Sequence, residues 1–430
     1  MEDKVRMNIQ DSVVDRIFYN IDRDELAQLA VDLTNIDSPT GREQEIANFI
    51  VNWFDENGFR TVKQEIESGR FNAIGIMPGT QQGSSLTLNG HLDIVATTQP
   101  IRSAYVNDGK VYGNEVANMK AGLATIMSAA KAIKKAGVEL KGDLIVATVA
   151  GEISVAPVDP FQEPQDRGEG VGTRHLLANG IQSDYAIVAD CSEYAIVRAQ
   201  AGVAYFKIST TGVQLYAPFT QRTDKVEATQ NSIIKMAEVI CELENWSRDY
   251  ERKSIYSFPG GRVEPKSVIT VLAAGMPRLL RDGWREPFNP SQTPPFCNLY
   301  MDIRLPPGVT PMEVKHNLEE FLAKLPFELS IEMFRSQRGY EGKGEKVDHL
   351  YSTIEKAYEH VFQKKPPPAP AGVSSIWTDT NLYWEIGIPA VKWGPSEIVK
   401  YPDMGTASIE GLVKAAKVYG LVVLDICGYI

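Results

Sequence analysis

The chain has 430 residues, of which 43% are hydrophobic and 23% are charged, and its formal net charge at pH 7 is −11. This length predicts two or three domains with ample core, and the negative charge argues against nucleic acid or an anionic membrane surface as a partner. No long apolar run predicts a membrane span and the N-terminus has no apolar signal region, so we expect a cytoplasmic protein. The four cysteines have no paired spacing, which argues against a disulfide framework and against a cysteine zinc site.

Two amphipathic helices are predicted within residues 21–57, separated by a turn at 37–41. A short buried strand at 86–88 follows, and His91 and Asp93 come directly after it. A histidine at a strand end with a carboxylate two residues later is a common layout for a metal ligand and the group that orients it. The pair alone is a weak signal, because a surface histidine with satisfied hydrogen bonds fits the same pattern.

Three further polar residues lie at the ends of predicted elements. Asn118 precedes a helix, Glu152 follows the apolar strand at 144–150, and Asp190 follows the strand at 185–189. Open α/β sheets build their sites at such strand ends. Each residue also has a plainer interpretation, a helix N-cap for Asn118 and a solvated loop carboxylate for Glu152. Taken together with His91, they indicate a site.

The sequence pattern changes near residue 202. From there it predicts an α+β arrangement in which helices cover one face of an antiparallel sheet, with strands at 204–208, 268–272, 299–303 and 327–334 and helices at 231–246 and 311–325. The α/β pattern resumes after residue 342, and the proline-rich stretch 364–370 is typical of a stiff connector. We therefore predict one domain formed by residues 1–201 and 341–430, with residues 202–340 inserted into it.

Short segments along nearly the whole chain carry a family resemblance. They are Gly90-His91-Leu92-Asp93, Asn118-Met119-Lys120-Ala121-Gly122, Gly151-Glu152-Ile153, Ala189-Asp190, Asp302-Ile303-Arg304 with Pro306-Pro307-Gly308, Thr378-Asp379-Thr380, Gly387-Ile388-Pro389 and Gly394-Pro395. In these segments the chain resembles the metallohydrolase family of aminoacylase, carboxypeptidase G, acetylornithine deacetylase and succinyl-diaminopimelate desuccinylase. The resemblance implies an α/β/α sandwich as catalytic domain and a ferredoxin-like α+β insert as lid and dimerisation domain. It also implies a homodimer or higher homo-oligomer that hydrolyses a C–N bond of a small amino-acid-like substrate, such as an N-acyl amino acid or a dipeptide.

The chain departs from this family at four positions. By the resemblance, an Asp that bridges two metal ions, a Glu that acts as base, a late His that binds the second ion and a His that stabilises the oxyanion are replaced here by Asn118, Gly151, Thr406 and Tyr216. The retained residues are His91, Asp93, Glu152 and Asp190. A neutral amide cannot offset the repulsion between two dications. We therefore expect at most one divalent ion, zinc or manganese, bound by His91 and Asp190 with Asn118 as a weak third ligand, while Glu152 is the only ligand left at the second position.

Glu152 is the residue that we expect to transfer protons. Without a second ion its carboxylate is free to act as the general base in place of Gly151, with Asp93 orienting His91. The plainer interpretation is that Glu152 is a relic with no proton to take.

Substrate contacts are predicted at four residues, Tyr216, Arg198, Asp379 and Asn381. Arg198 is a candidate for holding a substrate carboxylate, as are Arg167 and Arg174, although surface salt bridges explain each of them as well. The aromatic residues that flank Asp379 line either an apolar pocket or the core; they are Trp377, Tyr383 and Trp384. The stretch between Glu152 and Gly170 is either a pocket-shaping loop or a surface insertion.

Other classes of function remain open at this stage. One is an aminohydrolase that removes an amino group from an aromatic ring, as nitroanthranilate aminohydrolase does, for which the family's oxyanion histidine would be dispensable. A second is a metal-free enzyme that uses the same pocket for a non-hydrolytic reaction. A third is a catalytically silent homologue that binds a small ligand. Metal content separates these classes best.

Overall fold

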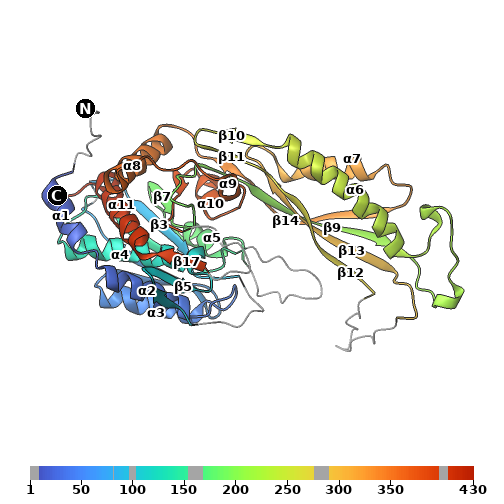
Figure 1. Ribbon diagram of the computed structural model, residues 1–430, viewed down its shortest axis with the longest axis horizontal. Helices are drawn as coiled ribbons and strands as arrows, with labels where there is room; N and C mark the ends of the chain where they lie inside the picture. The colour runs from blue at the N-terminus through green and yellow to red at the C-terminus, as the bar shows by residue number, and fades with distance from the viewer. Residues whose placement is uncertain (1–8, 81, 96–102, 154–167, 276–289, 397–404) are drawn as a thin grey trace.

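The computed structural model describes residues 9–80, 82–95, 103–153, 168–275, 290–396 and 405–430. It has a main domain, built from both outer parts of the chain, and an elongated inserted domain that extends from one side of it (Figure 1). The C-terminus lies on the main domain, at the end far from the insert.

A six-stranded sheet forms the centre of the main domain, in the order β1-β2-β6-β3-β7-β16. The strands β3, β6, β7 and β16 are parallel to one another. β2 runs antiparallel to both of its neighbours, β1 and β6. The bounds are Arg60–Glu67 for β1, Arg70–Met77 for β2, Leu86–His91 for β3, Leu144–Val149 for β6, Tyr185–Val188 for β7 and Ala390–Lys392 for β16. Every residue of β6 and β7 is buried, which is why both strands are almost entirely apolar.

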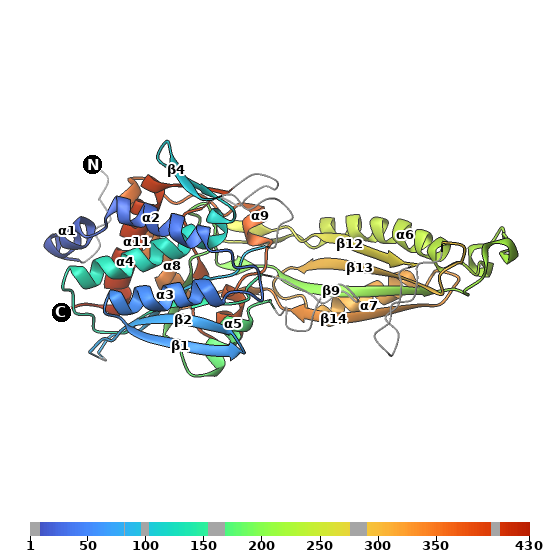
Figure 2. The same ribbon diagram turned by 90° about the horizontal axis from the view of Figure 1, so that it is seen from below.

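Helices cover both faces of this sheet (Figure 2). The helices α3, α4, α8 and α11 pack on one face, with α1 and α2 outside them, and α5 and α10 pack on the other. Their bounds are Asp11–Tyr19 for α1, Arg23–Asn35 for α2, Gln44–Glu56 for α3, Ala121–Lys135 for α4, Val171–Ala178 for α5, Glu345–Phe362 for α8, Thr380–Glu385 for α10 and Ile409–Cys427 for α11. The predicted α/β sandwich is therefore confirmed.

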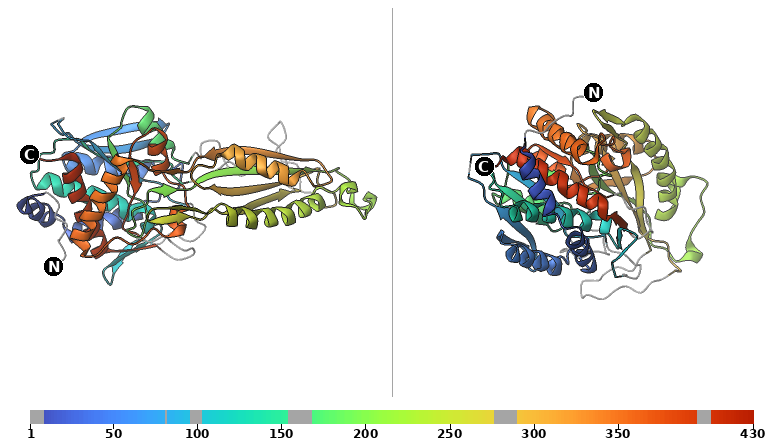
Figure 3. Two further views of the ribbon diagram at one scale, coloured as in Figure 1. Left: turned by 90° about the horizontal axis from the view of Figure 1, so that it is seen from above. Right: turned by 60° about the vertical axis from the view of Figure 1, so that its left-hand side comes forward.

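The inserted domain is a four-stranded antiparallel sheet in the order β12-β13-β9-β14 with two helices on one face (Figure 3). The strands are β9 Gly202–Thr211, β12 Ser267–Ala274, β13 Phe296–Leu305 and β14 Leu329–Gln337, and the helices are α6 Ser232–Lys253 and α7 Pro311–Leu322. Phe206 and Leu299 of the sheet share one apolar core with Met236 and Leu318 of the helices. This is the predicted α+β insert.

Short elements complete the fold. β8 Ala199–Gln200 pairs with β15 Tyr340–Glu341 where the two domains join, and the hairpin of β10 Tyr256–Phe258 and β11 Gly261–Val263 packs near α9 Ala371–Ser374. A three-stranded sheet contains β4 Tyr105–Asn107, β5 Lys110–Gly113 and β17 Gly405–Ser408. Three single turns are η1 Val116–Lys120, η2 Ala217–Phe219 and η3 Val226–Ala228. Within the described part of the chain, no helix combines the length and the apolar character needed to cross a membrane.

Two local expectations differ from the structure. Asn118 does not cap the following helix, because it lies inside η1 and turns its side chain to His91. Helix α6 continues to Lys253 instead of ending at 246. Its last turns are held by Tyr250, which stacks on Trp246 and donates a hydrogen bond to the carbonyl oxygen of Arg304.

Candidate active site

The candidate site lies where the four parallel strands of the main domain end. His91 is the last residue of β3, Glu152 follows β6, Asp190 follows β7, and Lys392 is the last residue of β16. Carboxyl ends of parallel strands meet at one edge of a sheet, so strand order alone gathers these side chains. All four are buried.

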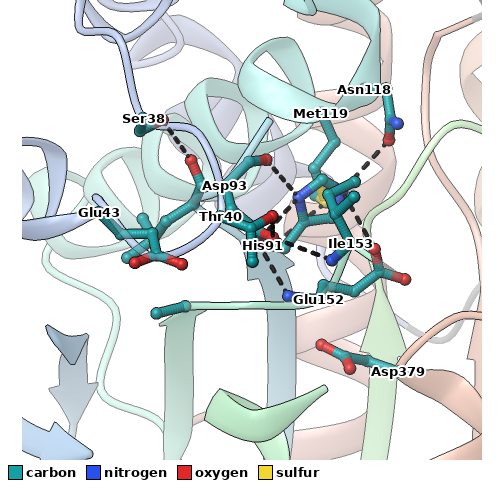
Figure 4. Close-up of polar contacts among 12 residues, drawn as sticks. Ser38, Thr40, Glu43, His91, Asp93, Asn118, Met119, Glu152, Ile153 and Asp379 are labelled. Carbon is teal, nitrogen blue, oxygen red and sulfur yellow. Dashed lines mark hydrogen bonds and ion pairs between the residues drawn. The ribbon is translucent and has the colours of Figure 1, made fainter. Parts of the chain in front are cut away.

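His91 is held by contacts at both ring nitrogens. Its Nδ1 is 2.9 Å from the carbonyl oxygen of Asp93, and its Nε2 is 3.1 Å from Oδ1 of Asn118 (Figure 4). Nε2 also lies 3.9 Å from Oε2 of Glu152. Nε2 of His91 therefore contacts a neutral amide and has a carboxylate nearby, beyond hydrogen-bond distance.

Asp93 supports the site through a different contact from the one predicted. Its carboxylate accepts hydrogen bonds from Oγ1 of Thr40 and from the backbone N–H groups of Glu152 and Ile153, at 2.8–2.9 Å. Its Oδ1 is 3.6 Å from Nδ1 of His91, farther than the Asp93 carbonyl oxygen. The carbonyl group thus orients the imidazole, while the carboxylate fixes the turn that carries Glu152.

Glu152 and Asp379 are two buried carboxyl groups that lie close together at the site (Figure 4). Burial raises the pKa of Glu152 well above its ordinary value, and Asp379, Asp190 and Asp93 raise it further, whereas Lys392 opposes them. Burial likewise raises the pKa of Asp379 to about 7, although Oγ1 of Thr173 donates a 2.7 Å hydrogen bond to this carboxyl group. Both carboxyl groups therefore keep a proton to higher pH than an exposed carboxyl group, and Asp379 can exchange it near neutral pH.

Lys392 is the residue of the site that sequence reasoning missed. Its fully buried ammonium group lies 2.9 Å from Oδ2 of Asp190, whose Oδ1 accepts a 2.6 Å hydrogen bond from the backbone N–H of Cys191. Burial raises the pKa of Asp190, but Lys392 and His91 outweigh it and the pKa is lowered. A signal was present in the sequence, since Lys392 interrupts the otherwise apolar run Ala390-Val391-Lys392-Trp393.

The donor atoms do not fit the two-ion site that the family resemblance implies. Among the described residues, no group of three or more His, Cys, Asp or Glu side chains is arranged to hold a metal ion. Asn118 is neutral, and Thr406 is an exposed residue of β17. Asp190 is already paired with an ammonium group. The expected single ion at His91, Asp190 and Asn118 stays a prediction, and Lys392 competes with it.

Two predicted substrate contacts are corrected by the structure. Arg198 donates from Nε and Nη2 to the carbonyl oxygen of Gly342, and its Nη1 pairs with Asp348 at 2.8 Å, so it ties the domain junction together. Asn381 also has a structural role, because it donates to the carbonyl oxygen of Ala201 and accepts from the backbone N–H of Tyr340. Both side chains bind main-chain groups near the junction of the two domains.

The other predicted contacts are divided. Asp379 lies in the site, whereas Tyr216 is half exposed beside η2 in the inserted domain, on a segment at the end far from the main domain (Figure 1). Tyr216 therefore does not join His91 within one subunit. Trp377 and Tyr383 are buried in a core cluster, against which Trp384 packs. Arg167 and most of the stretch after Glu152 lie outside the described residues.

A cavity of about 740 Å³ lies between the two domains. It is lined by α5 and α10 on one side and by β14 and the start of α7 on the other. Two of its arginines already have partners: Arg174 pairs with Glu385, and Arg335 pairs with Glu169. Arg174 thus forms a surface salt bridge, which was the alternative to its predicted contact with a substrate carboxylate.

Comparisons with known proteins agree with this architecture. The sequence matches the peptidase family M20/M25/M40 over residues 87–425. It is 26% identical to an N-formyl-4-amino-5-aminomethyl-2-methylpyrimidine deformylase of Bacillus subtilis strain 168, covering 92% of this chain and 93% of the relative. It is 28% identical to an acetylornithine deacetylase of Proteus mirabilis, covering 79% and 81%.

Solved structures show the same fold. The aminopeptidase PepT of Bacillus cereus superposes with a TM-score of 0.67 at 17% identity, covering 94% of this chain and 99% of that chain. The YXEP protein of Bacillus subtilis, described as a dinuclear metal-binding peptidase of the M20 family, superposes with a TM-score of 0.59 at 15% identity, covering 95% and 99%. Since the family match spans most of the sequence and the fold agrees, this chain belongs to the peptidase family M20/M25/M40.

Proposed function

We propose that this protein hydrolyses a C–N bond of a small N-acylated amine or amino-acid-like substrate, in the manner of an N-acyl amino acid deacylase or a dipeptidase. Family membership supports a hydrolase, and the two relatives described above are named for removing a formyl or an acetyl group from an amine. The observation that carries the proposal is the buried carboxyl group of Glu152 beside His91 at the strand ends.

Amide hydrolysis requires that one proton leaves the attacking water and that one reaches the departing nitrogen. Glu152 suits both transfers, because its buried carboxyl group lies beside His91, with Oε2 3.9 Å from Nε2. Asp93 holds the main chain of Glu152 in place, and Asp379 is a second carboxyl group that exchanges a proton near neutral pH. The chain's own residues thus supply the proton transfers.

The decisive variant is Glu152→Gln, which keeps the shape of the side chain and removes its basicity. We expect turnover to fall by about a hundredfold or more with little change in substrate binding. The substrate panel should contain N-formyl, N-acetyl and N-succinyl amino acids, dipeptides and aminobenzoates, the last to detect an aromatic aminohydrolase. Unchanged turnover of the variant on an active substrate would overturn the role of Glu152.

A catalytically silent ligand-binding homologue is the second candidate. The observation that favours it is the replacement of the family's base by Gly151, together with the ion pair of Lys392 and Asp190. Binding of panel compounds without turnover would support this candidate and refute the first.

We also propose that copies of the chain associate through the inserted domain, by helix α6 or by the exposed edge of its sheet. β12 is an edge strand of the four-stranded sheet, and its Val268 and Leu272 are about half exposed. Uncovered sheet edges tend to pair with other strands. We expect a homodimer or higher oligomer by light scattering at micromolar concentration, and Leu272→Lys should weaken it. A strict monomer would contradict this proposal.

A further inference from the structure

We propose that the ammonium group of Lys392 takes the place of a divalent cation beside Asp190, so that this site has its own built-in cation and functions without bound metal. This proposal rests in part on the proposed function, because both concern the same site. Its main test measures metal binding, so it can fail or succeed independently of the reaction.

The geometry of Asp190 leaves little room for another cation. Both carboxylate oxygens have partners, with Lys392 Nζ at 2.9 Å from Oδ2 and the N–H of Cys191 at 2.6 Å from Oδ1. The Lys392 side chain is fully buried and that of Asp190 is 4% exposed. A metal ion that used Asp190 would have to displace the ammonium group or lie close to it, and like charges repel strongly in a poorly hydrated pocket.

The central sheet holds the backbone of Lys392 in place. Lys392 pairs with Val188 of β7, and its backbone exchanges two hydrogen bonds with Val197. The strand end that carries Asp190 is thus the direct neighbour of the strand that carries the lysine. The backbone from which the lysine side chain extends is therefore fixed beside Asp190.

Asn118 also makes the site less suited to a metal ion. Asn118 is a neutral amide, and its Oδ1 lies 3.1 Å from His91 Nε2, the nitrogen that faces the pocket. A neutral side chain at position 118 supplies no negative charge to hold a metal ion, and Lys392 adds a positive charge to the site. Each change alone weakens metal binding, and together they replace the ion by a side chain.

The first experiment measures metal in the wild-type protein. The full chain is produced with zinc and manganese supplied, purified without chelators and analysed by elemental mass spectrometry and by titration with zinc chloride and manganese chloride. We expect well under one ion per subunit and no tight binding. One or two tightly bound ions per subunit would overturn the proposal.

A pair of variants then tests whether Lys392 is the cause. Asn118→Asp alone restores a carboxylate but leaves the ammonium group, so we expect no tight ion. Asn118→Asp combined with Lys392→Met frees Asp190, and we expect at least one ion per subunit. Equal metal binding by the single and the double variant, both folded by circular dichroism, would overturn the role of Lys392.

Two controls separate this inference from the proposed function. Lys414→Met removes a lysine on the exposed side of α11 that pairs with Glu410 at 2.7 Å, and in the Asn118→Asp background it should add no metal. If a panel substrate is turned over, chelators should leave the rate unchanged. Loss of turnover in chelator with recovery on adding manganese would overturn the metal-free site and leave the hydrolase standing.

Discussion

Asp93 and Asp190 are buried carboxylates at the ends of neighbouring parallel strands, yet they are stabilised in different ways. Asp93 accepts hydrogen bonds from Thr40 and from two backbone N–H groups. Asp190 has one backbone donor and the ammonium group of Lys392. The first carboxylate depends on the main chain, whereas the second depends on a cation. Loss of a charge should therefore lower the free energy of unfolding more on the Asp190 side of the site than on the Asp93 side.

The largest expected effect is that of Lys392→Ala, measured in metal-free buffer. Removing one partner of a buried ion pair leaves an uncompensated charge, which costs about 3–5 kcal/mol of folding free energy. Asp93→Asn is the matched variant on the other side, and loss of charge-assisted hydrogen bonds there should cost about 1–3 kcal/mol. Urea unfolding followed by tryptophan fluorescence compares them. An equal or smaller loss for Lys392→Ala would contradict the difference between the two sides.

The next effect is a pH dependence at Asp379. Its pKa is raised to about 7 in the folded protein, because the carboxyl group is buried. The folded state therefore binds this proton more tightly than the unfolded state, whose value is about 4, and the group's contribution to stability falls as pH rises from about 4 to about 7. Asp379→Asn cannot ionise and still accepts the hydrogen bond of Thr173, so it avoids this loss.

The melting temperature of Asp379→Asn relative to the wild type should therefore increase between pH 5 and pH 8. The loss that it avoids is on the order of 4 kcal/mol at most. Asp24→Asn, at a highly exposed position, serves as the control and should show no such trend. Parallel pH profiles for wild type and Asp379→Asn would show that this carboxyl group does not stay protonated near neutral pH.

The sequence predicts which residues follow the strands of the sheet, but not which distant residues contact them. Apolar runs and strand order suffice to bring His91, Glu152 and Asp190 together, because all three follow buried strands of one parallel sheet. Contacts between residues far apart in the chain cannot be predicted from such local patterns. The sequence predicts a substrate contact for Arg198, because nothing local reveals that Gly342 and Asp348, far along the chain, use its donors. Lys392 was missed because a lysine in a strand is ordinarily a surface residue, and only the sheet neighbour shows its buried partner.

The smallest expected effect concerns Gly151, which by the family resemblance stands at the position of the base. Its backbone has φ +67, a left-handed conformation that costs a residue with a side chain about 1 kcal/mol. Gly151→Ala should lose about this much stability, and Gly137→Ala, with φ +64 and open space around it, should lose a similar amount. Gly151→Glu adds the same strain and a further carboxyl group beside Glu152, so restoring the family residue should not restore a stronger base. If Gly151→Glu raised turnover well above that of the wild type, the base would belong at position 151, and Glu152 would not be the residue that transfers the proton.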